Sequence, residues 1–493
     1  MNQNAQKSSQ KKTGFKTAIT PTRQDDFPEW YQQVIKAADM AENAPVRGCM
    51  IIKPYGFAIW ENMQRIFDGM IKEVGVENAY FPLLIPLSYI AQEAQHIDGF
   101  AKECAVVTHH RLEASEDGQG LKPAGELSEP FVIRPTSETI IGESFSKWIT
   151  SYRDLPMKLN QWCNVMRWEM RPRLFLRTSE FLWQEGHNAF ATAEEANADA
   201  RLMVEKYREF AEDYLAIPMI VGEKTPDERF PGAVATYTME AIMQDGKALQ
   251  AGTSHDLGQT FSNAADISFQ DKDGKMKKAW TTSWGISTRL IGGLIMSHAD
   301  DDGLVLPPKI APYQVVIIPF SKGESSEELL SFCEDINSNL IEKGVRTKLD
   351  RSGGKPSDKL WKSIKRGVPI RIEIGDRELE NGELTFVPRD IGRDGKQTVS
   401  KDAFLSLVKG ELDRIQKSIF DRAKERTENQ ILETNSIETL YEIFKGSQPV
   451  QVMIPTKLLE DSKFEEIKKE FSVTPRCMPF TDGTDKVMVG KAY

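Results

Sequence analysis

The 493-residue sequence lacks the marks of a membrane-bound or secreted protein. No apolar run approaches the roughly 20 residues that a membrane-spanning helix needs. Residues 1–12 form a polar tail without the apolar stretch of a signal peptide. The five cysteines are scattered and include no Cys-x-x-Cys pair, which is typical of reduced thiols in the cytosol. We therefore expect a cytoplasmic protein without a membrane partner.

The chain also lacks an excess of positive charge, because its net charge is −10. This disfavours binding to nucleic acid without excluding it, since phosphate contacts need only a local basic surface. One such segment exists at residues 345–371, where nine Lys and Arg residues accompany two acidic residues. A solvated helix face would explain this run, and a contact with a polyanion would explain it equally well.

Length and hydrophobic patterning predict several domains, since 493 residues suffice for two to four buried cores. Helices are predicted at Asp26–Ala44 and Ala58–Val74, and the second has a wide apolar stripe that ends before Gly75. The β-like run that follows contains Pro82 and Pro86. We therefore expect it at the edge of a sheet.

Turn residues and hydrophobic alternation predict the elements that follow. In chain order these are an exposed loop at Glu116–Glu129, a strand at Pro130–Arg134, a helix at Glu194–Leu215, a turn of small residues at Gln250–His255, and a segment at Trp280–Arg289 leading into a helix with Gly292 and Gly293.

A domain boundary is expected at Pro307–Pro312. Beyond it, three apolar runs and an amphipathic helix alternate as β-α-β, which is typical of an α/β domain with a largely parallel sheet. These elements are Val315–Ile318, Ser325–Lys343, Arg346–Leu349 and Ile370–Ile374. A second boundary is expected near Ser400, followed by a charged helix and a small α/β domain that begins near Glu433.

The stretch from Asn164 to His187 is the most informative part of the sequence, because its second predicted strand alternates strictly. One face of that strand carries two aromatic rings, a carboxylate and an imidazole. This face suits a small charged ligand better than a core, because buried ionisable groups need partners. The four residues are Phe181, Trp183, Glu185 and His187.

The loop before this strand carries three arginines, and guanidinium groups held on paired strands suit phosphate. A hairpin whose arginines only solvate its tip is the alternative. The loop residues are Arg171, Arg173 and Arg177, bracketed by Arg167 and Glu169.

Three further segments carry polar residues that packing explains poorly, although each has an ordinary explanation when taken alone. Thr136 and Glu138 could cap the next helix, His255 could be a loop histidine, and Arg289 could be a surface arginine. The three sets are Thr136 and Glu138; Gln250, Thr253 and His255; and Ser283, Ser287 and Arg289.

Taken in order, five motifs resemble those of the prolyl-tRNA synthetases, a family of class II aminoacyl-tRNA synthetases, and in particular the archaeal/eukaryotic type. They are RPTSE at 134–138, LRTSEFLWQEGH at 176–187, QAGTSHDLGQ at 250–259, SWGISTR at 283–289 and HADDDGLVLPP at 298–308. The resemblance extends from about Gly14 to the C-terminus. The long apolar helix and proline-bearing strand resemble motif 1, which builds the homodimer interface in that family.

The resemblance implies an α/β multi-domain fold. A disordered tail would occupy residues 1–13, and a class II antiparallel sheet flanked by helices would form the catalytic domain at 14–306. An α/β anticodon-binding domain would follow at 307–400, and a small α/β C-terminal domain at 401–493.

The implied function is that of a proline–tRNA ligase, which activates L-proline with ATP and transfers prolyl to the 3′-terminal adenosine of tRNA(Pro). The attacking carboxylate is already ionised, so positioning and charge neutralisation should carry the rate. Arg167 would bridge the two reactants, and Phe181 and Arg289 would stack on adenine. Arg167 and Arg289 are thus the expected catalytic residues. The other ATP residues would be Glu169 with Mg²⁺, Arg177, Thr178, Gln250, Thr253 and Ser287.

The resemblance also implies the other two binding sites. Thr136 and Glu138 offer acceptors for the secondary ammonium of proline. The remaining proline residues would be Arg167, Trp183, Glu185, His187, His255 and Ser283, although Glu185 and His187 could pair for purely structural reasons. In the basic segment, Trp361 is available to stack on anticodon bases or belongs to the core. The anticodon-binding residues would be Lys359, Arg366 and Arg371.

The sequence departs from the family in two features, a zinc site and an editing domain. Relatives often hold zinc with four cysteines in the C-terminal domain, but only Cys477 remains here, and one thiolate cannot form a tetrahedral site. We therefore expect a zinc-free domain and no metal site. The interval from His187 to Gln250 is also too short for an inserted editing domain.

Two rival functions remain open. Another class IIa enzyme, such as a threonyl-tRNA synthetase, would need a histidine/cysteine zinc set around its amino-acid pocket. A synthetase-like binding or regulatory protein without catalysis would usually lack one of the two expected catalytic arginines, and this chain keeps both Arg167 and Arg289.

Overall fold

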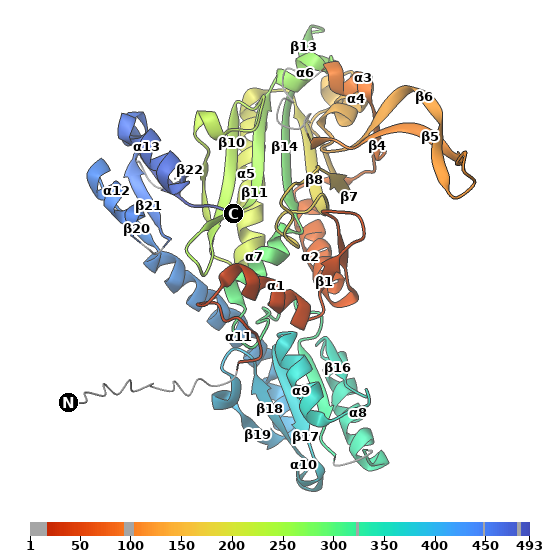
Figure 1. Cartoon of the computed structure of the whole chain (residues 1–493), viewed down its shortest axis with the longest axis vertical. Coiled ribbons are helices and arrows are strands. Elements are labelled where there is room, and N and C mark those ends of the chain that lie inside the picture. The colour runs from red at the N-terminus through yellow and green to blue at the C-terminus, as the bar shows by residue number, and fades with distance from the viewer. Residues whose placement is uncertain (1–16, 93–102, 322–324, 447–448, 481–484) are drawn as a thin grey trace, which may run out of the picture.

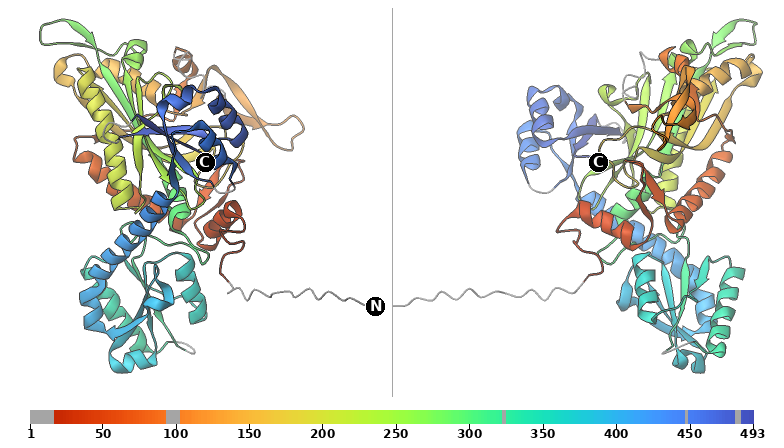
Figure 2. Two further views of the ribbon diagram at one scale, coloured as in Figure 1. Left: turned by 90° about the vertical axis from the view of Figure 1, so that its left-hand side faces the viewer. Right: turned by 45° about the vertical axis from the view of Figure 1, so that its right-hand side comes forward.

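The computed structural model describes residues 17–92, 103–321, 325–446, 449–480 and 485–493, and the predicted tail at residues 1–13 lies outside them. The molecule is elongated (Figure 1). A large sheet with its helices lies at one end, and a smaller α/β domain lies at the other. The two views of Figure 2 show the C-terminal strands beside the large sheet.

The largest sheet of the described residues has eleven strands, and most neighbours are antiparallel. In order across the sheet they are β20 (Ile431–Glu433), β21 (Gln451–Pro455), β23 (Lys486–Gly490), β22 (Thr474–Pro479), β9 (Ile220–Glu223), β10 (Ala235–Ile242), β11 (Ala248–Gly258), β14 (Trp280–Ser287), β8 (Glu180–Phe190), β7 (Met157–Met166) and β3 (Glu77–Asn78).

Among the described residues, four helices share the main core with one face of this sheet: α1 (Phe27–Ala37), α2 (Pro54–Lys72), α5 (Ala193–Asp213) and α7 (Arg289–His298). Helix α5 begins with a capping box between Thr192 and Glu195. The sequence pattern predicted both α5 and α2. Helix α2 ends before Gly75, whose φ is 83°. Covering one face leaves the opposite face of the central strands available for a site.

Helix α1 (Phe27–Ala37) is shorter than the predicted range Asp26–Ala44, which was wrong at its C-terminal end. Asp39 has a positive φ of 58°, which turns the chain out of the helix. The next residues pair instead as a small hairpin of β1 (Ala41–Asn43) and β2 (Met50–Ile52).

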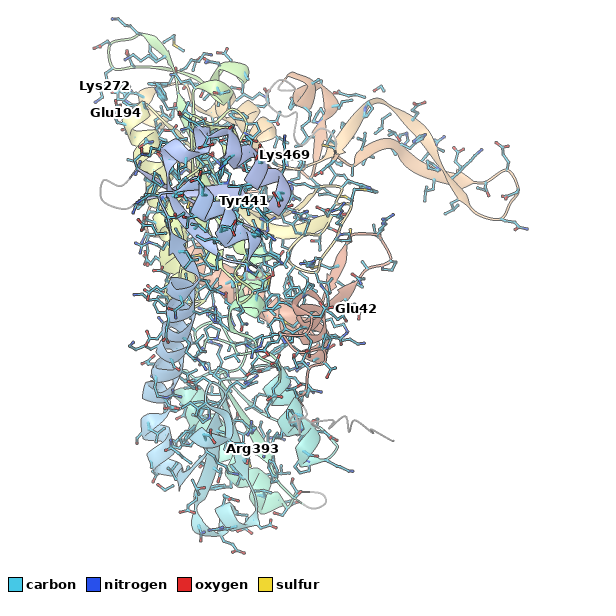
Figure 3. All side chains as sticks on the ribbon, turned by 60° about the vertical axis from the view of Figure 1, so that its left-hand side comes forward. Glu42, Glu194, Lys272, Arg393, Tyr441 and Lys469 are labelled. Carbon is cyan, nitrogen blue, oxygen red and sulfur yellow. The ribbon has the colours of Figure 1, made fainter. Side chains whose placement is uncertain are left out.

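A separate sheet has the order β4 (Leu84–Pro86), β6 (Leu121–Ile133), β5 (Val106–Ala114), so the proline-bearing strand lies at an edge as predicted. The exposed loop predicted at Glu116–Glu129 was wrong, because most of it belongs to β6. Strands β5 and β6 form a projecting hairpin whose side chains extend into solvent (Figure 3). With both faces exposed, the hairpin lacks the apolar alternation that would have revealed it.

The turn predicted at Gln250–His255 was also wrong, because these residues lie within β11. The small residues serve close packing between strands instead. A Cβ atom at Gly252 would lie 2.7 Å from the Cγ2 atom of Ile286 on the neighbouring strand. Composition typical of a turn therefore marks a crowded position in the sheet.

Around these sheets lie short connecting elements. They are α3 (Leu87–Gln92), α4 (Glu138–Trp148), α6 (Thr260–Ala264), and the hairpin of β12 (Ser268–Gln270) and β13 (Met276–Lys278).

The second domain has a five-stranded sheet in which the first three strands are parallel and the last two antiparallel. The predicted β-α-β order is correct. In order across the sheet its strands are β16 (Thr347–Leu349), β15 (Val315–Pro319), β17 (Ile370–Ile374), β18 (Glu383–Pro388) and β19 (Gln397–Ser400), with helices α8 (Glu327–Glu342), α9 (Pro356–Lys365) and α10 (Asp376–Asn381).

Helix α11 (Lys401–Asn429) begins at the boundary expected near Ser400, which is its N-cap residue. Phe404, Val408 and Ile415 pack in the same core as β15 and β17. The helix then leads to the C-terminal unit, in which α12 (Ile437–Lys445) and α13 (Ser462–Phe471) cover a small core of their own.

The C-terminal unit is joined to the large sheet by direct strand pairing. Met478 and Pro479 of β22 lie opposite Glu223 and Gly222 of β9. The C-terminal strands therefore extend the large sheet instead of forming a detached sheet. Among the described residues, no helix has the length and hydropathy needed to cross a bilayer.

This strand junction yields a first prediction. A Cβ atom at Gly222 would lie 2.3 Å from the backbone oxygen of Met478, so Gly222→Ala should force β9 and β22 apart. We expect a lower Tm, equivalent to about 1–3 kcal/mol of overpacking. Gly410→Ala is the control, because Gly410 lies within helix α11 with nothing near its Cβ position. A Gly222→Ala protein as stable as the Gly410→Ala protein would contradict the junction.

Candidate active site

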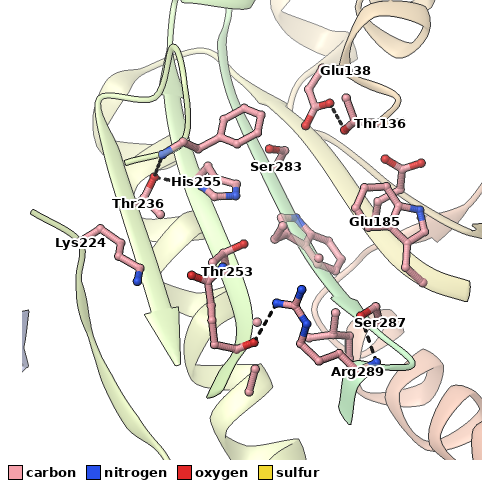
Figure 4. A pocket seen from close by; sticks show the side chains of 18 of the residues that line it. Thr136, Glu138, Glu185, Lys224, Thr236, Thr253, His255, Ser283, Ser287 and Arg289 are labelled. Atoms are coloured by element: carbon pink, nitrogen blue, oxygen red, sulfur yellow. Dashed lines mark hydrogen bonds between the residues drawn. The ribbon is translucent and has the colours of Figure 1, made fainter. Parts of the chain in front are cut away.

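Rows of side chains cross the uncovered face of the large sheet and form the floor of a cavity of about 280 Å³ (Figure 4). Residues two apart on a strand share a face, so neighbouring strands in register bring their side chains into one row. The rows are Thr236, His255, Ser283 and His187; Thr238, Thr253, Gly285 and Glu185; and the pairs Glu240 with Gln250 and Ser287 with Trp183. Of these residues, Thr238 and Glu240 do not line the cavity.

This register brings together the residues predicted from four separate motifs. The alternation predicted for strand β8 is confirmed, because its four outward residues line the cavity while Leu182 packs against the main core. The predicted residues that line the cavity are Thr136, Glu138, Arg167, Phe181, Trp183, Glu185, His187, Gln250, Thr253, His255, Ser283, Ser287 and Arg289.

The buried carboxylate of Glu185 organises one end of the cavity. Its Oε1 atom accepts hydrogen bonds from Ser137 Oγ at 2.5 Å and Gln161 Nε2 at 2.9 Å, and its Oε2 atom lies 2.9 Å from His187 Nε2. Burial raises the pKa of Glu185, but these hydrogen bonds and the charge of His187 outweigh it and lower the pKa overall. Glu185 therefore stays ionised.

The two histidines of the cavity differ in charge. Burial lowers the pKa of His187, but the hydrogen bond and charge of Glu185 outweigh burial and raise it. Burial and the charge of His187 lower the pKa of His255 to about 3, so His255 is neutral. His255 also stacks on Phe230, with ring centroids 4.6 Å apart.

A short hydrogen bond joins Thr136 to Glu138 at the start of helix α4. Figure 4 shows both side chains beside the row that contains Ser283. The buried Ser283 hydroxyl has no hydrogen-bond partner among the described residues. Carboxylate and hydroxyl acceptors therefore surround this end of the cavity.

Arg167 and Arg289 lie toward the other end of the cavity. Arg167 Nε donates to the backbone oxygen of Pro135 at 3.0 Å, and its guanidinium lies over the rings of Phe181 and Trp183 at 5.7 and 5.4 Å. Arg289 Nε donates to the backbone oxygen of Leu176 at 3.2 Å.

Both guanidinium groups are buried and have lowered pKa values. Burial lowers the pKa of Arg167, and burial together with the charge of Arg167 lowers the pKa of Arg289 to about 10. Both remain charged at neutral pH, so an anion in this cavity would be stabilised.

A second cavity of about 320 Å³ adjoins the first and shares Arg167, Phe181, Ser287 and Arg289 with it. Its remaining predicted residues come from the loop between β7 and β8. They are Glu169, Arg177 and Thr178. Arg171 and Arg173 do not line either cavity. Arg173 instead lies over the ring of Tyr493 at 5.9 Å.

Tyr493 is held by hydrogen bonds at the turn between β10 and β11. Tyr493 Oη donates to Asp245 Oδ2 at 2.6 Å, and its backbone N–H donates to the oxygen of Ala248 at 3.0 Å. Lys247 Nζ also lies over its ring at 4.9 Å.

The cavity also contains residues that the sequence patterns missed. Lys224, Phe230 and Thr236 lie at the β9–β10 side. Nothing in their local sequence marks them, because they enter the site only through the pairing of Thr236 with His255 across the sheet.

The three predicted anticodon residues lie in different surroundings. Lys359 donates to the backbone oxygen of Asp350 at 3.2 Å, whereas Arg371 is buried and pairs with Glu373 at 2.8 Å. Arg366 stacks on Tyr55 of the catalytic domain at 4.7 Å. Lys359 and Arg366 share a small hollow with Lys348 and Lys362, and Arg371 does not line it.

Comparisons with known proteins agree with this architecture. Residues 122–298 match the tRNA synthetase class II core domain (G, H, P, S and T), and residues 314–411 match the anticodon binding domain. The fold and site therefore define a class II aminoacyl-tRNA synthetase.

The relatives narrow this assignment. The proline–tRNA ligase of Bdellovibrio bacteriovorus is 53% identical over 472 residues, 94% of each chain, and that of Akkermansia muciniphila is 52% identical over 474 residues, also 94% of each. The crystal structure of the Cryptosporidium parvum prolyl-tRNA synthetase complexed with halofuginone and AMPPNP matches with a TM-score of 0.88 and 36% identity, covering 97% of this chain and 99% of that one. The chain belongs to the prolyl-tRNA synthetases.

The Glu185–His187 pair yields a second prediction. Since the pKa of His187 is raised, the stability from this pair is fully present below the ordinary 6.5 and is lost as pH rises through the raised value. Glu185→Gln should therefore lower Tm most below pH 6.5, equivalent to about 3–5 kcal/mol for an uncompensated buried pair, and less at higher pH.

His255→Gln is the comparison for this measurement. Because the pKa of His255 is lowered to about 3, only its unfolded state takes up a proton as pH falls below 6.5, so its Tm penalty should shrink toward pH 5, opposite to that of Glu185→Gln. A Glu185→Gln penalty that does not change with pH would show that His187 is uncharged.

Proposed function

We propose how the pocket of this ATP-dependent proline–tRNA ligase divides its work between two reactants. Proline occupies the end formed by Thr136, Glu138 and Ser283, and ATP occupies the end formed by Phe181 and Arg289. The observation that carries this division is the opposite charge of the two ends. Acceptors surround one end, and the buried guanidinium groups of Arg167 and Arg289 lie at the other.

The proline end suits a secondary ammonium. Thr136 and Glu138 accept its two hydrogen bonds. Trp183 walls the ring, with His255 and Ser283 at the end of the slot, and the unpartnered Ser283 hydroxyl offers a further polar contact. Glu185 and His187 act indirectly, because the carboxylate of Glu185 holds the His187 imidazole and Ser137 in place.

The ATP end suits a nucleotide. Phe181 and Arg289 stack on adenine from opposite sides, while Gln250 and Thr253 contact the ribose. Arg177, Thr178 and Ser287 line the way to the second cavity, which takes the β- and γ-phosphates. Glu169 offers carboxylate oxygens, the ligands that Mg²⁺ prefers. When bound, Mg²⁺ neutralises phosphate charge.

Activation needs neither a general base nor a covalent intermediate. The proline carboxylate attacks the α-phosphate of ATP, forms the prolyl-adenylate and releases pyrophosphate. Arg167 holds both anions at the junction of the two cavities, so it reduces their repulsion and fixes their approach. The prolyl group then passes to the 3′-terminal adenosine of tRNA(Pro). Proline-dependent exchange between ATP and pyrophosphate tests this function, and a catalytically inactive binding protein would show none.

Arg167→Ala gives a third prediction. Loss of the contact to both reactants should lower the exchange rate about 10²–10³-fold, or about 3–4 kcal/mol of transition-state stabilisation. Arg153→Ala removes an exposed arginine outside the cavity and serves as the control. An Arg167→Ala protein within tenfold of the wild type would remove Arg167 from the catalytic centre.

The second domain is proposed to bind the anticodon through its basic segment, with Lys359, Arg366 and Arg371 as the first candidates. Lys348 and Lys362 are the exposed lysines of the hollow beside α9, and Lys359 is half-exposed between them and the protein. Arg366 and Arg371 have partners in the protein and would serve mainly to shape this surface.

Lys359→Ala is the fourth prediction. It should raise the KM for tRNA while leaving proline-dependent exchange nearly unchanged, because the two sites lie in separate domains. Lys409→Ala, on the exposed side of α11, is the control. A parallel loss of exchange and charging would assign Lys359 a structural role.

We also propose a homodimer in the cytoplasm. Large apolar side chains are exposed around β4, α3 and α4, and an exposed apolar cluster of this kind is typical of an interaction surface. They are Tyr80, Leu84, Leu87 and Trp148, with exposed fractions of 73, 38, 39 and 48%. Sedimentation as a monomer at micromolar concentration would contradict this proposal.

Three finer assignments rest on the sequence. They are the archaeal/eukaryotic type, a C-terminal unit without zinc, and the absence of an editing domain.

A slot for pyrrolidine cannot exclude alanine by size, and lost apolar contact gives only about 1–3 kcal/mol per methylene. As a fifth prediction, the enzyme activates alanine slowly and leaves preformed Ala-tRNA(Pro) to decay at its spontaneous rate. Faster decay would reveal an editing site. One zinc per chain by elemental analysis would overturn the zinc-free assignment.

A further inference from the structure

Three charged side chains are buried together where the C-terminal strands join the catalytic sheet. Lys224 follows β9, Glu240 lies on β10 and Arg476 lies on β22. Lys224 Nζ lies 3.0 Å from Glu240 Oε1, and Arg476 Nη2 lies 2.8 Å from Glu240 Oε2. The three side chains are 3, 0 and 9% exposed.

If this cluster served only packing, apolar side chains in the same positions would stabilise the fold at least as well. Desolvation of buried charges offsets much of their attraction, and apolar residues of similar size often stabilise such a position better. The cluster is also unbalanced, because two cations share one carboxylate. Arg476 takes Oε2, so Lys224 shares the charge of Glu240 instead of holding it alone.

Lys224 faces the reaction pocket as well as this cluster. Its backbone N–H donates to Thr236 at 2.8 Å, which extends the row of Thr236, His255 and Ser283 by one position. Lys224 lines the main cavity, and Figure 4 shows it on the side opposite Glu185.

Neither proline nor ATP is proposed to occupy this side of the cavity. Besides Lys224, it is lined by Glu228, Arg229 and Phe230. The reaction has a third substrate, whose terminal ribose must reach the prolyl-adenylate from a side that the other two leave open. The group next to that ribose is a phosphodiester, an anion that an ammonium recognises.

We propose that Lys224 binds the phosphodiester preceding the 3′-terminal adenosine of tRNA, and that Arg476 positions Lys224 by sharing Glu240 with it. The inference rests on the division of the pocket proposed above. Arg476 is thus a positioning residue: without it, Glu240 would draw the Lys224 ammonium fully to itself and away from the cavity.

The test compares two rates in the full-length enzyme: proline-dependent exchange, and single-turnover transfer of proline from bound prolyl-adenylate to tRNA. Lys224→Met should lower the ratio of transfer to exchange by about tenfold, the loss expected for one charge-assisted hydrogen bond. Lys224→Arg should restore most of it. Lys158→Met is the matched control, because Lys158 lies on strand β7 of the same sheet and also pairs with a buried carboxylate, Asp199 of helix α5, outside the cavity.

Arg476→Met should lower the same ratio in the wild-type background and add nothing in the Lys224→Met background, because it acts through Lys224. Salt dependence gives an independent readout. Loss of one phosphate contact to a single strand should reduce the slope of log affinity for tRNA against log salt by roughly 0.7.

Three outcomes would overturn the proposal: an unchanged ratio in Lys224→Met, effects of Arg476→Met and Lys224→Met that multiply, or an unchanged salt slope. If Lys224→Met does not fold, Lys224→Gln is measured in the same way and decides the question. Absence of exchange in the wild-type enzyme would instead refute the proposed function, so the two failures are distinguishable.

Discussion

One buried carboxylate organises the pocket of this synthetase. Glu185 accepts hydrogen bonds from Ser137, which precedes helix α4, and from Gln161 on strand β7, and it pairs with His187 on its own strand. Three elements are thereby locked around a single ionised group. Because each donor would be left buried without a partner if the carboxylate were lost, the arrangement is rigid. Rigidity matters here, because a reaction without a general base depends on positioning.

Charge is arranged in opposite senses at the two ends of the pocket. Glu138 and Glu185 lie at the end assigned to the ammonium, whereas Arg167 and Arg289 lie where the carboxylate and phosphates would meet. Burial lowers the pKa of both arginines, and the charge of Arg167 lowers that of Arg289 further, so the protein holds two buried cations here at a cost. A protein retains such strain where a ligand relieves it, and an anion bound between them would do so.

The sequence predicted most of this site because strand alternation is a local property. The face of Phe181, Trp183, Glu185 and His187 was readable from spacing alone, and the motifs identified the partners on other strands. The sequence did not reveal residues that join the site only through register. Lys224 and Phe230 stand in an unremarkable segment, and the pairing of Thr236 with His255 brings them to the cavity.

The predictions of the fold that were wrong failed for the same reason: they depended on contacts between strands that are distant in the sequence. The residues Gln250–His255 have the composition of a turn, yet they lie within strand β11, where Gly252 leaves room for the side chain of Ile286. The hairpin of β5 and β6 is polar on both faces and so carries no period-two signal. The continuation of the catalytic sheet into the C-terminal strands depends on one short contact between β9 and β22, which no local pattern encodes.

The central claim is that proline and ATP occupy adjoining ends of one pocket and meet at Arg167. Isothermal titration with a non-hydrolysable sulfamate analogue of prolyl-adenylate tests it most directly. If both ends lie within reach of one ligand, linking the two parts should give an affinity at least about 10²-fold above that of either proline or AMP alone. An analogue that binds no more tightly than AMP would show that the two ends do not form one site.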